Sequence, residues 1–448
     1  MEKYVLLKLR VNGVKGIEKE LEFNFSNSLL KRSFDNSNSH VKAIYGSNGA
    51  GKTAVIYAMR MFNQLIQTKD YISLANYDGT FKKIINQNTK KFFIETTFAL
   101  IDNDSNIKDI YIQSYTVEQK KKDESYFISY ESLKKLIGLN LSITNKTKLI
   151  YEVCLNKLKL NCDKEDYDII ASSCTNLLGN KSFIQIISSD VEKLYHKVKY
   201  KELFVSLGCL SLFSVNTVVV INDNDKDYIS PSKFIDIFSN ISKIKNEDTK
   251  MFDALIQRNK IPSSNDDIVF VKYLDKYEKE ISGVTKFLKV FKTDLETIEI
   301  EKKIEGEFYH CRIILVYKDG RRIDKQFESV GVKKLIGYYD AFCNLERGGI
   351  VFIDEFDANI HDVLLTKLLE YITFYTEGQF VFTTHNLNPM HILKKQKYAI
   401  DFISNDGYVT SWKSSGNYDP ASLYSKGLID KSPFDMSPSD FIGVFENE

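Results

Sequence analysis

The 448-residue sequence has little of several features that point to particular classes of protein. Its six cysteines include no C-x-x-C pair and no spacing typical of a zinc site. The formal net charge is only +1, so the overall charge indicates neither a nucleic-acid partner nor a membrane surface. We expect the cysteines to be reduced core residues, namely Cys154, Cys162, Cys174, Cys209, Cys311 and Cys343.

Long apolar runs, internal repeats and sustained heptads are also missing from the sequence. No run is long enough to cross a bilayer, and residues 1–10 alternate like a strand instead of forming a signal peptide. We therefore expect a cytoplasmic protein without membrane contact. Residues 129–201 have a predominantly helical pattern, but their apolar residues never sustain a heptad spacing, so a long coiled-coil arm is not expected.

The composition that remains is that of a folded protein with more than one lobe. Hydrophobic residues make up 43% and charged residues 27% of the chain, and the length exceeds what one core usually serves. Lysine-rich segments at 120–122 and 394–397 are candidates for DNA contact, although a solvated surface is the favoured interpretation.

Residues 46–53, GSNGAGKT, fit the phosphate-binding pattern G-x-x-x-x-G-K-[ST] at every specified position. A short apolar strand at 40–45 precedes them, and residues 53–66 have helical apolar spacing, which is the context that the pattern requires. Backbone amides at a helix N-terminus bind phosphate, a lysine reaches the β and γ oxygens, and a hydroxyl binds Mg²⁺. We therefore predict that ATP is bound by Asn48, Gly49, Ala50, Gly51, Lys52 and Thr53.

A second run, at 350–355, is an apolar strand that ends in two acids. Asp354 is predicted to hold Mg²⁺ together with Thr53, and Glu355 to orient or deprotonate the attacking water. His385 lies 31 residues beyond Asp354 and follows another apolar strand, so it is predicted to contact the γ-phosphate. Glu355, Lys52 and His385 are the predicted catalytic residues.

A third run, Ser329-Val330-Gly331-Val332-Lys333, lies 25 residues before Asp354 and opens a stretch of helical periodicity. Taken alone, it reads as an ordinary capped helix. With the other two runs it has the order of an ABC-type ATPase head, in which Ser329 and Gly331 would serve the γ-phosphate of a second copy. His361 is open to two interpretations, an interface contact or a helix cap.

These runs, with residues 43–58 and 381–386, carry a resemblance to SMC/RecN-like ABC ATPases. The chain more closely resembles the ATPase half of overcoming-lysogenisation-defect (OLD) proteins, abortive-infection ATPases, and ATPase subunits of the anti-phage systems Septu and PARIS. Two features depart from the pattern. Val330 replaces the first glycine of the transporter-type signature, and the glutamine loop has only Gln87 and Gln113 as candidates.

The resemblance implies an ATP- and Mg²⁺-dependent ATPase that works as a homodimer or higher homo-oligomer. It further implies anti-phage defence through a nuclease or toxin effector. Because only 63 residues follow His385, we expect that effector to be a separate polypeptide. The alternatives are a DNA-clamping repair ATPase, a non-hydrolysing scaffold and a transporter head, in decreasing order of support.

The predicted fold class is α/β, an ABC-type P-loop head with a mixed sheet flanked by helices, an antiparallel β subdomain and a helical insertion. Residues 1–128 are expected to form the first part of the head, 129–290 a mostly helical insertion or short arm, and 291–448 the second part of the head. Antiparallel hairpins are predicted at 4–25, 91–117 and 295–317.

Overall fold

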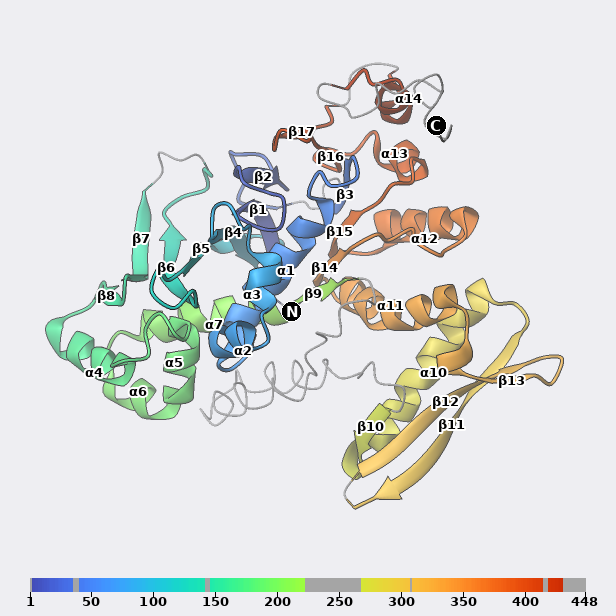
Figure 1. Cartoon of the computed structure of the whole chain (residues 1–448), viewed down its shortest axis with the longest axis horizontal. Helices are drawn as coiled ribbons and strands as arrows, with labels where there is room; N and C mark the ends of the chain where they lie inside the picture. Colours follow the sequence, from blue (N-terminus) through green and yellow to red (C-terminus); the bar gives the residue numbers. More distant parts are fainter. Residues whose placement is uncertain are drawn as a thin grey trace, which may run out of the picture.

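The computed structural model describes residues 2–34, 40–141, 146–221, 267–306, 308–413 and 418–429. Residues 222–266 of the expected insertion and residues 430–448 of the C-terminal tail lie outside this description. Within the described residues, the strands form three sheets, and helices pack on both faces of the central one (Figure 1).

The central sheet has the strand order β17-β16-β3-β15-β14-β9, and all neighbours from β16 to β9 are parallel. β17 pairs antiparallel at one edge. β15 therefore separates the strand before the glycine loop from the strand before the two acids. The strands are β3 (Val41–Gly46), β9 (Thr217–Val220), β14 (Ile350–Ile353), β15 (Gln379–Thr383), β16 (Ile400–Ile403) and β17 (Val409–Ser411).

This sheet is buried on both faces, which explains why its strands are continuous apolar runs. In β14, Ile350 and Phe352 join one hydrophobic core, whereas Val351 and Ile353 join the other. The first core contains α1 (Lys52–Gln67) and α7 (Lys201–Val215). The second core contains α10 (Leu274–Phe291), α11 (Val330–Glu346), α12 (Asp362–Tyr375), α13 (Asn388–Leu393) and α14 (Pro420–Ser425).

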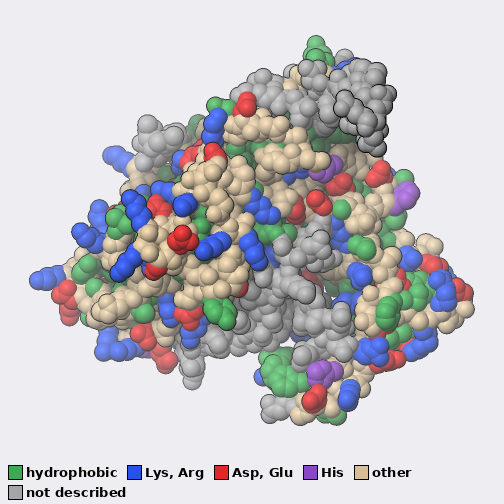
Figure 2. Space-filling model, in the orientation of Figure 1, with side chains coloured by type: hydrophobic (Ala, Val, Ile, Leu, Met, Phe, Trp, Pro, Cys, Tyr) green, Lys and Arg blue, Asp and Glu red, His purple; other side chains and the backbone are tan. Residues whose placement is uncertain are grey.

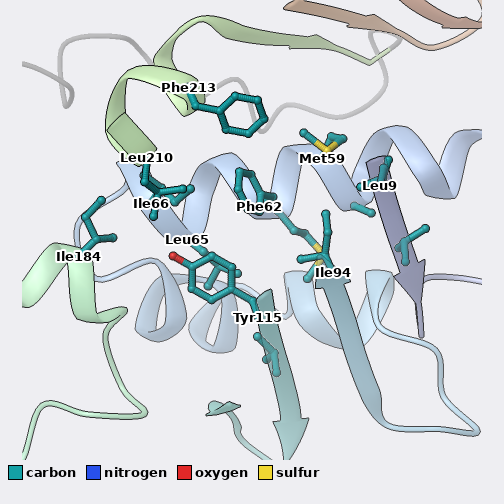
Figure 3. Packing of buried hydrophobic residues seen from close by; sticks show 14 of the residues in the cluster. Leu9, Met59, Phe62, Leu65, Ile66, Ile94, Tyr115, Ile184, Leu210 and Phe213 are labelled. Carbon is teal, nitrogen blue, oxygen red and sulfur yellow. The ribbon is translucent and has the colours of Figure 1, made fainter. Parts of the chain in front are cut away.

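A seven-stranded antiparallel sheet, ordered β2-β1-β4-β5-β6-β7-β8, packs against the glycine-loop helix α1. Figure 3 shows Phe62 of α1 between this sheet and α7, with ring centroids 5.9 Å from Tyr115 and 6.0 Å from Phe213. The strands are β1 (Lys3–Asn12), β2 (Leu21–Asn24), β4 (Lys91–Ile101), β5 (Ile107–Gln119), β6 (Tyr126–Leu136), β7 (Thr147–Cys154) and β8 (Lys157–Leu160). The hairpins predicted at 4–25 and 91–117 are confirmed.

The expectation that residues 129–201 are mainly helical is wrong for residues 129–163, which contain no helix in the described part of the chain. Strands β6, β7 and β8 extend the antiparallel sheet to residue 160, and the helices begin only at Lys164. β6 lies inside the sheet and is buried on both faces in part, so it lacks the alternation that identifies a strand. The short helices of this part of the chain are α2 (Tyr71–Tyr77), α3 (Thr80–Ile84), α4 (Lys164–Cys174), α5 (Phe183–Ser189) and α6 (Val191–Lys197).

The third sheet lies beside α10 and forms a separate projection in Figure 1. It has the order β10-β12-β11, with β13 paired to β12, and it confirms the hairpin predicted at 295–317. Its elements are β10 (Asp267–Phe270), η2 (Val271–Tyr273), β11 (Leu295–Glu305), β12 (Phe308–Tyr317), β13 (Arg322–Asp324) and η3 (Lys325–Phe327).

All six cysteines are free thiols, but the prediction that they belong to the core holds only for some of them. Cys174, Cys209 and Cys311 are buried, whereas Cys154 at the end of β7 is exposed. None of the helices in the described part of the chain is both long and apolar enough to cross a bilayer.

Candidate functional site

The glycine loop connects the fully buried strand β3 to α1, as the sequence predicts. Gly49 and Gly51 have φ angles of 83° and 105°, in the left-handed region that favours glycine. A Cβ at Gly51 would lie only 2.7 Å from the Ile17 side chain, and one at Gly46 would lie 2.8 Å from the Ile403 carbonyl oxygen. The loop is therefore shaped by backbone contacts that other residues would disturb.

Lys52 is the first residue of α1, and its ammonium group is turned back over the loop. Its Nζ donates to the carbonyl oxygens of Gly46 and Ser47, at 2.8 and 3.0 Å. Burial lowers the pKa of Lys52, and the negative charges of Asp354 and Glu355 oppose that shift. The lysine is thus held at the loop, within the electrostatic influence of both acids.

Asp354 follows β14 directly and is almost fully buried, with 3% of its surface exposed. Burial raises the pKa of Asp354, while hydrogen bonds from the Thr383 and Thr53 hydroxyls partly lower it. The structure therefore brings the two predicted Mg²⁺ ligands together. A hydroxyl and a carboxylate are hard oxygen donors, which suit Mg²⁺ when substrate phosphates complete its shell.

Glu355 is exposed, but its backbone is fixed in an unusual conformation. Its φ angle is 45°, a left-handed value that typically costs on the order of 1–3 kcal/mol for a residue with a side chain. Its backbone amide donates to Thr383 Oγ1 at 2.8 Å, and its carbonyl accepts from Lys334 Nζ at 2.7 Å. The backbone of Glu355 is thus fixed on both sides while its side chain stays accessible, as a water-orienting group requires.

Thr383 is a functional residue that sequence reasoning missed. Its hydroxyl donates to Asp354 Oδ1 at 2.6 Å and accepts from the Glu355 amide, so one side chain positions both acids. It is the last residue of β15, the strand between the glycine-loop strand and the acidic strand. A hydroxyl directly after the apolar residues 380–382 was the available signal.

Lys334 was also missed, although its position in the sequence offered a signal. It is 7% exposed and lies on the same helix as Ser329, with its Nζ donating to the carbonyls of Glu355 and Ala358. A lysine among the buried positions of an amphipathic helix requires a polar partner. Lys334 thereby ties α11 to the segment that follows the acids.

Lys15 completes the charged surroundings of Asp354. It lies in the turn between β1 and β2, its Nζ is 3.6 Å from the centroid of the Tyr57 ring on α1, and its charge lowers the pKa of Asp354. Its φ angle of 48° shows that the turn is tightly constrained. No pattern in the sequence relates this lysine to the distant acids.

The N-terminus of α11 begins as predicted, with Ser329 as the cap. Its Oγ accepts from the Val332 amide at 3.4 Å, a long hydrogen bond. A Cβ at Gly331 would lie 2.4 Å from the Asn359 carbonyl oxygen, so glycine lets α11 approach that segment closely. Within the described residues, no hydrogen bond joins Ser329 or Gly331 to the glycine loop of the same chain.

His385 is exposed and lies two residues beyond β15, where it borders a hollow together with Gly46. The structure thus places it next to the start of the glycine loop. His361 caps α12, because its Nδ1 accepts from the Val363 amide at 3.3 Å. The cap interpretation of His361 is confirmed, and a role at an interface stays a prediction.

The two candidates for a glutamine loop do not reach the acids. Gln113 is fully buried in the antiparallel sheet, where its amide donates to the Tyr151 hydroxyl at 3.1 Å. Gln87 is exposed, and its amide donates to backbone carbonyls of its own turn, including Ile85. Gln113 is therefore a wrong candidate, and Gln87 has no contact with the site in this conformation.

A family model described as "AAA domain, putative AbiEii toxin, Type IV TA system" matches residues 214–389. This range contains residues 327–333 at the start of α11, called the α11 tip below, together with both acids and His385. It does not contain the glycine loop. No curated protein matches the sequence significantly.

Several solved structures are similar to this chain at low sequence identity. The Smc head domain of Pyrococcus furiosus with an extended coiled coil, bound to the C-terminal domain of ScpA, is 12% identical, covers 91% of this chain and 96% of its own, and has a TM-score of 0.39. The head domain of Thermotoga maritima is 14% identical over 91% of this chain and 99% of its own, with a TM-score of 0.30. The Pyrococcus yayanosii head with a coiled coil and joint is 11% identical over 92% and 98%, with a TM-score of 0.40.

The chain therefore has an α/β fold in which the glycine loop, the paired acids and the intervening strand lie where the sequence predicts them for a P-loop head.

Proposed function

We propose that this protein is an ATPase whose two copies close around two ATP·Mg²⁺ and reopen after hydrolysis. The proposal rests on one observation: some of the predicted site residues lie together in one chain, and others lie apart from them. Lys52, Thr53 and Asp354 are gathered in one chain, whereas Ser329 and Gly331 have no hydrogen bond to that loop within the described residues. A second copy would supply the missing helix tip.

In this cycle each residue has a defined task. The amides of residues 48–53 and Lys52 bind the phosphates. Thr53 and Asp354 would hold Mg²⁺, which would supply positive charge to the phosphate oxygens. Glu355 orients or deprotonates the water, with its backbone fixed by Thr383 and Lys334. His385 contacts the γ-phosphate from the neighbouring strand end.

We further propose that the cycle controls a separately encoded nuclease or toxin in anti-phage defence. The resemblance to OLD, Septu and PARIS ATPases supports this role, as does the "putative AbiEii toxin" named in the description of the matching family model. Charged side chains of both signs are interspersed on the face shown in Figure 2, which favours the switch over direct clamping of DNA. DNA-stimulated turnover would instead favour the DNA-repair alternative.

The decisive experiment measures mass in solution with ATP and Mg²⁺. Glu355→Gln should bind ATP, fail to hydrolyse it and shift from monomer to dimer, and the dimer should be lost when Lys52→Ala is added. A mass that does not respond to ATP in Glu355→Gln would contradict the proposal. Purification of the native complex from its host would then identify the effector.

A further inference from the structure

A hollow of about 240 Å³ lies between the C-terminal helix α14 and the end of β15. Its walls combine Tyr45 and Gly46 at the end of β3, His385 and Leu387 after β15, and Tyr424 of α14. It is therefore adjacent to the predicted γ-phosphate contact His385 and to the first glycine of the phosphate-binding loop.

Two buried tyrosines in the walls of this hollow pack closely on neighbouring side chains. Tyr424 is 4% exposed, its ring stacks on Phe402 with a centroid distance of 5.1 Å, and it meets the Tyr45 ring edge-on at 6.0 Å. The Tyr45 hydroxyl donates to the Asn386 carbonyl at 3.0 Å, which fixes the segment after His385. The hollow is thus preformed in a single chain.

Its size suits a protein side chain better than a free ligand. Pockets for drug-sized molecules are typically about 300–1,000 Å³, which is larger than this hollow. Preformed pockets of this kind at protein interfaces receive single aromatic anchors. The lining by Tyr45, Leu387 and Tyr424 favours an apolar occupant.

The α11 tip exposes apolar side chains of the required kind. Phe327 is 77% exposed and Val330 is 51% exposed, on either side of Ser329. The neighbouring residue Glu328 is buried and accepts hydrogen bonds from the Tyr317 hydroxyl and the Ser329 amide, so the tip is held in one conformation. An exposed phenylalanine on a fixed tip can bind a partner with little loss of conformational entropy.

We propose that Phe327 of the partner subunit inserts into the hollow beside His385 when the two copies close. This inference rests on the proposed function and adds the apolar anchor that holds the dimer. Ser329 is two residues from Phe327, a span of at most about 7 Å, and the hollow begins at the glycine loop itself. One tip therefore reaches the γ-phosphate and the hollow together, and two-fold symmetry repeats the contact.

The test uses the full chain in the Glu355→Gln background with ATP and Mg²⁺. Phe327→Ser should weaken dimerisation by tenfold or more in sedimentation equilibrium, and ATP binding to the protomer should stay unchanged. The matched control is Phe374→Ser, because Phe374 is also strongly exposed, at 65%, but lies near the end of α12. The control should change the dimer dissociation constant less than threefold.

A second measurement locates the contact. In a Cys154→Ser background, which removes the exposed native thiol, Phe327→Cys combined with Leu387→Cys should form intermolecular cross-links with a short bismaleimide only when ATP is present. Each single-cysteine variant should form few intermolecular cross-links. If the parent protein dimerises with ATP but Phe327→Ser dimerises equally well and the pair does not cross-link, this inference is wrong while the proposed function stands. If the parent does not dimerise, the proposed function itself fails.

Discussion

The glycine-loop side of the site and the α11 tip differ in how far a single chain completes them. On the first side, buried groups already meet: Asp354 accepts from Thr383 and Thr53, and Lys52 bonds the loop carbonyls. On the second, the exposed Ser329 side chain accepts one long capping hydrogen bond. The difference teaches that burial brings the glycine-loop residues and Asp354 together within one chain, whereas the proposed role of the exposed Ser329 depends on a second copy.

The first way to test this comparison is to remove the lysine on the assembled side. Lys52→Ala should abolish detectable ATP binding and all turnover, because the ammonium is the point charge that meets the β and γ oxygens. A fluorescent-nucleotide titration measures the binding. Lys69→Ala, at the opposite end of α1, is the control and should bind ATP like the unaltered protein.

The second prediction separates binding from chemistry on the same side. Glu355→Gln should lower kcat by about 10²–10⁴-fold, the usual contribution of a general base, with a dissociation constant for ATP within threefold of the unaltered protein. Single-turnover kinetics and titration provide the two numbers. Unchanged kcat would show that another group activates the water.

The third prediction concerns Thr383, which the structure alone revealed. Thr383→Val should lower the free energy of unfolding by about 1–3 kcal/mol and weaken Mg²⁺-dependent turnover, because a buried carboxylate and the Glu355 amide both lose a hydrogen bond. Urea unfolding and magnesium titration of turnover measure the two effects. Thr373→Val is the matched control, since this buried threonine hydroxyl has no hydrogen-bond partner among the described residues, and it should leave both nearly unchanged.

The smallest expected effect lies away from the nucleotide, at Glu131 of β6. Burial raises the pKa of Glu131 to about 7, although its side chain accepts from the Tyr151 hydroxyl at 2.6 Å and the Phe183 amide at 2.9 Å. The folded state therefore binds this proton more tightly than the unfolded state, and stability should fall as pH rises from about 4.5 to 7.

Glu131→Gln removes the titrating carboxyl group and should flatten the dependence of stability on pH between about 4.5 and 7. Each unit of pKa shift corresponds to about 1.4 kcal/mol of stability. The size of the rise in the pKa of Glu131 therefore sets the upper limit on the pH-dependent change in the free energy of unfolding. Urea unfolding at several pH values measures it. If stability depends on pH equally steeply in both proteins, other groups cause the dependence. Turnover at pH 7 should differ little between the two proteins.

The difference between local and distant contacts explains how much of the fold and the site the sequence alone could predict. The central strands and the residues Lys52, Thr53, Asp354 and Glu355 were found because their local patterns coincide with their tertiary roles. Residues 129–160 were misread because β6 is a strand by virtue of its neighbours in the sheet, with no clear alternation of its own. Thr383 and Lys334 escaped notice because their partners are distant in the sequence.

The claim that each site needs residues from two copies is tested most directly by mixing two inactive variants. Lys52→Ala and Ser329→Arg should each lack turnover, because one spoils the loop and the other blocks the helix tip. In an equal mixture, a heterodimer combines one intact loop with the intact tip of its partner, so turnover should return to at most about a quarter of the unaltered value. Full turnover by Ser329→Arg alone, or no recovery in a mixture that forms dimers, would contradict the account.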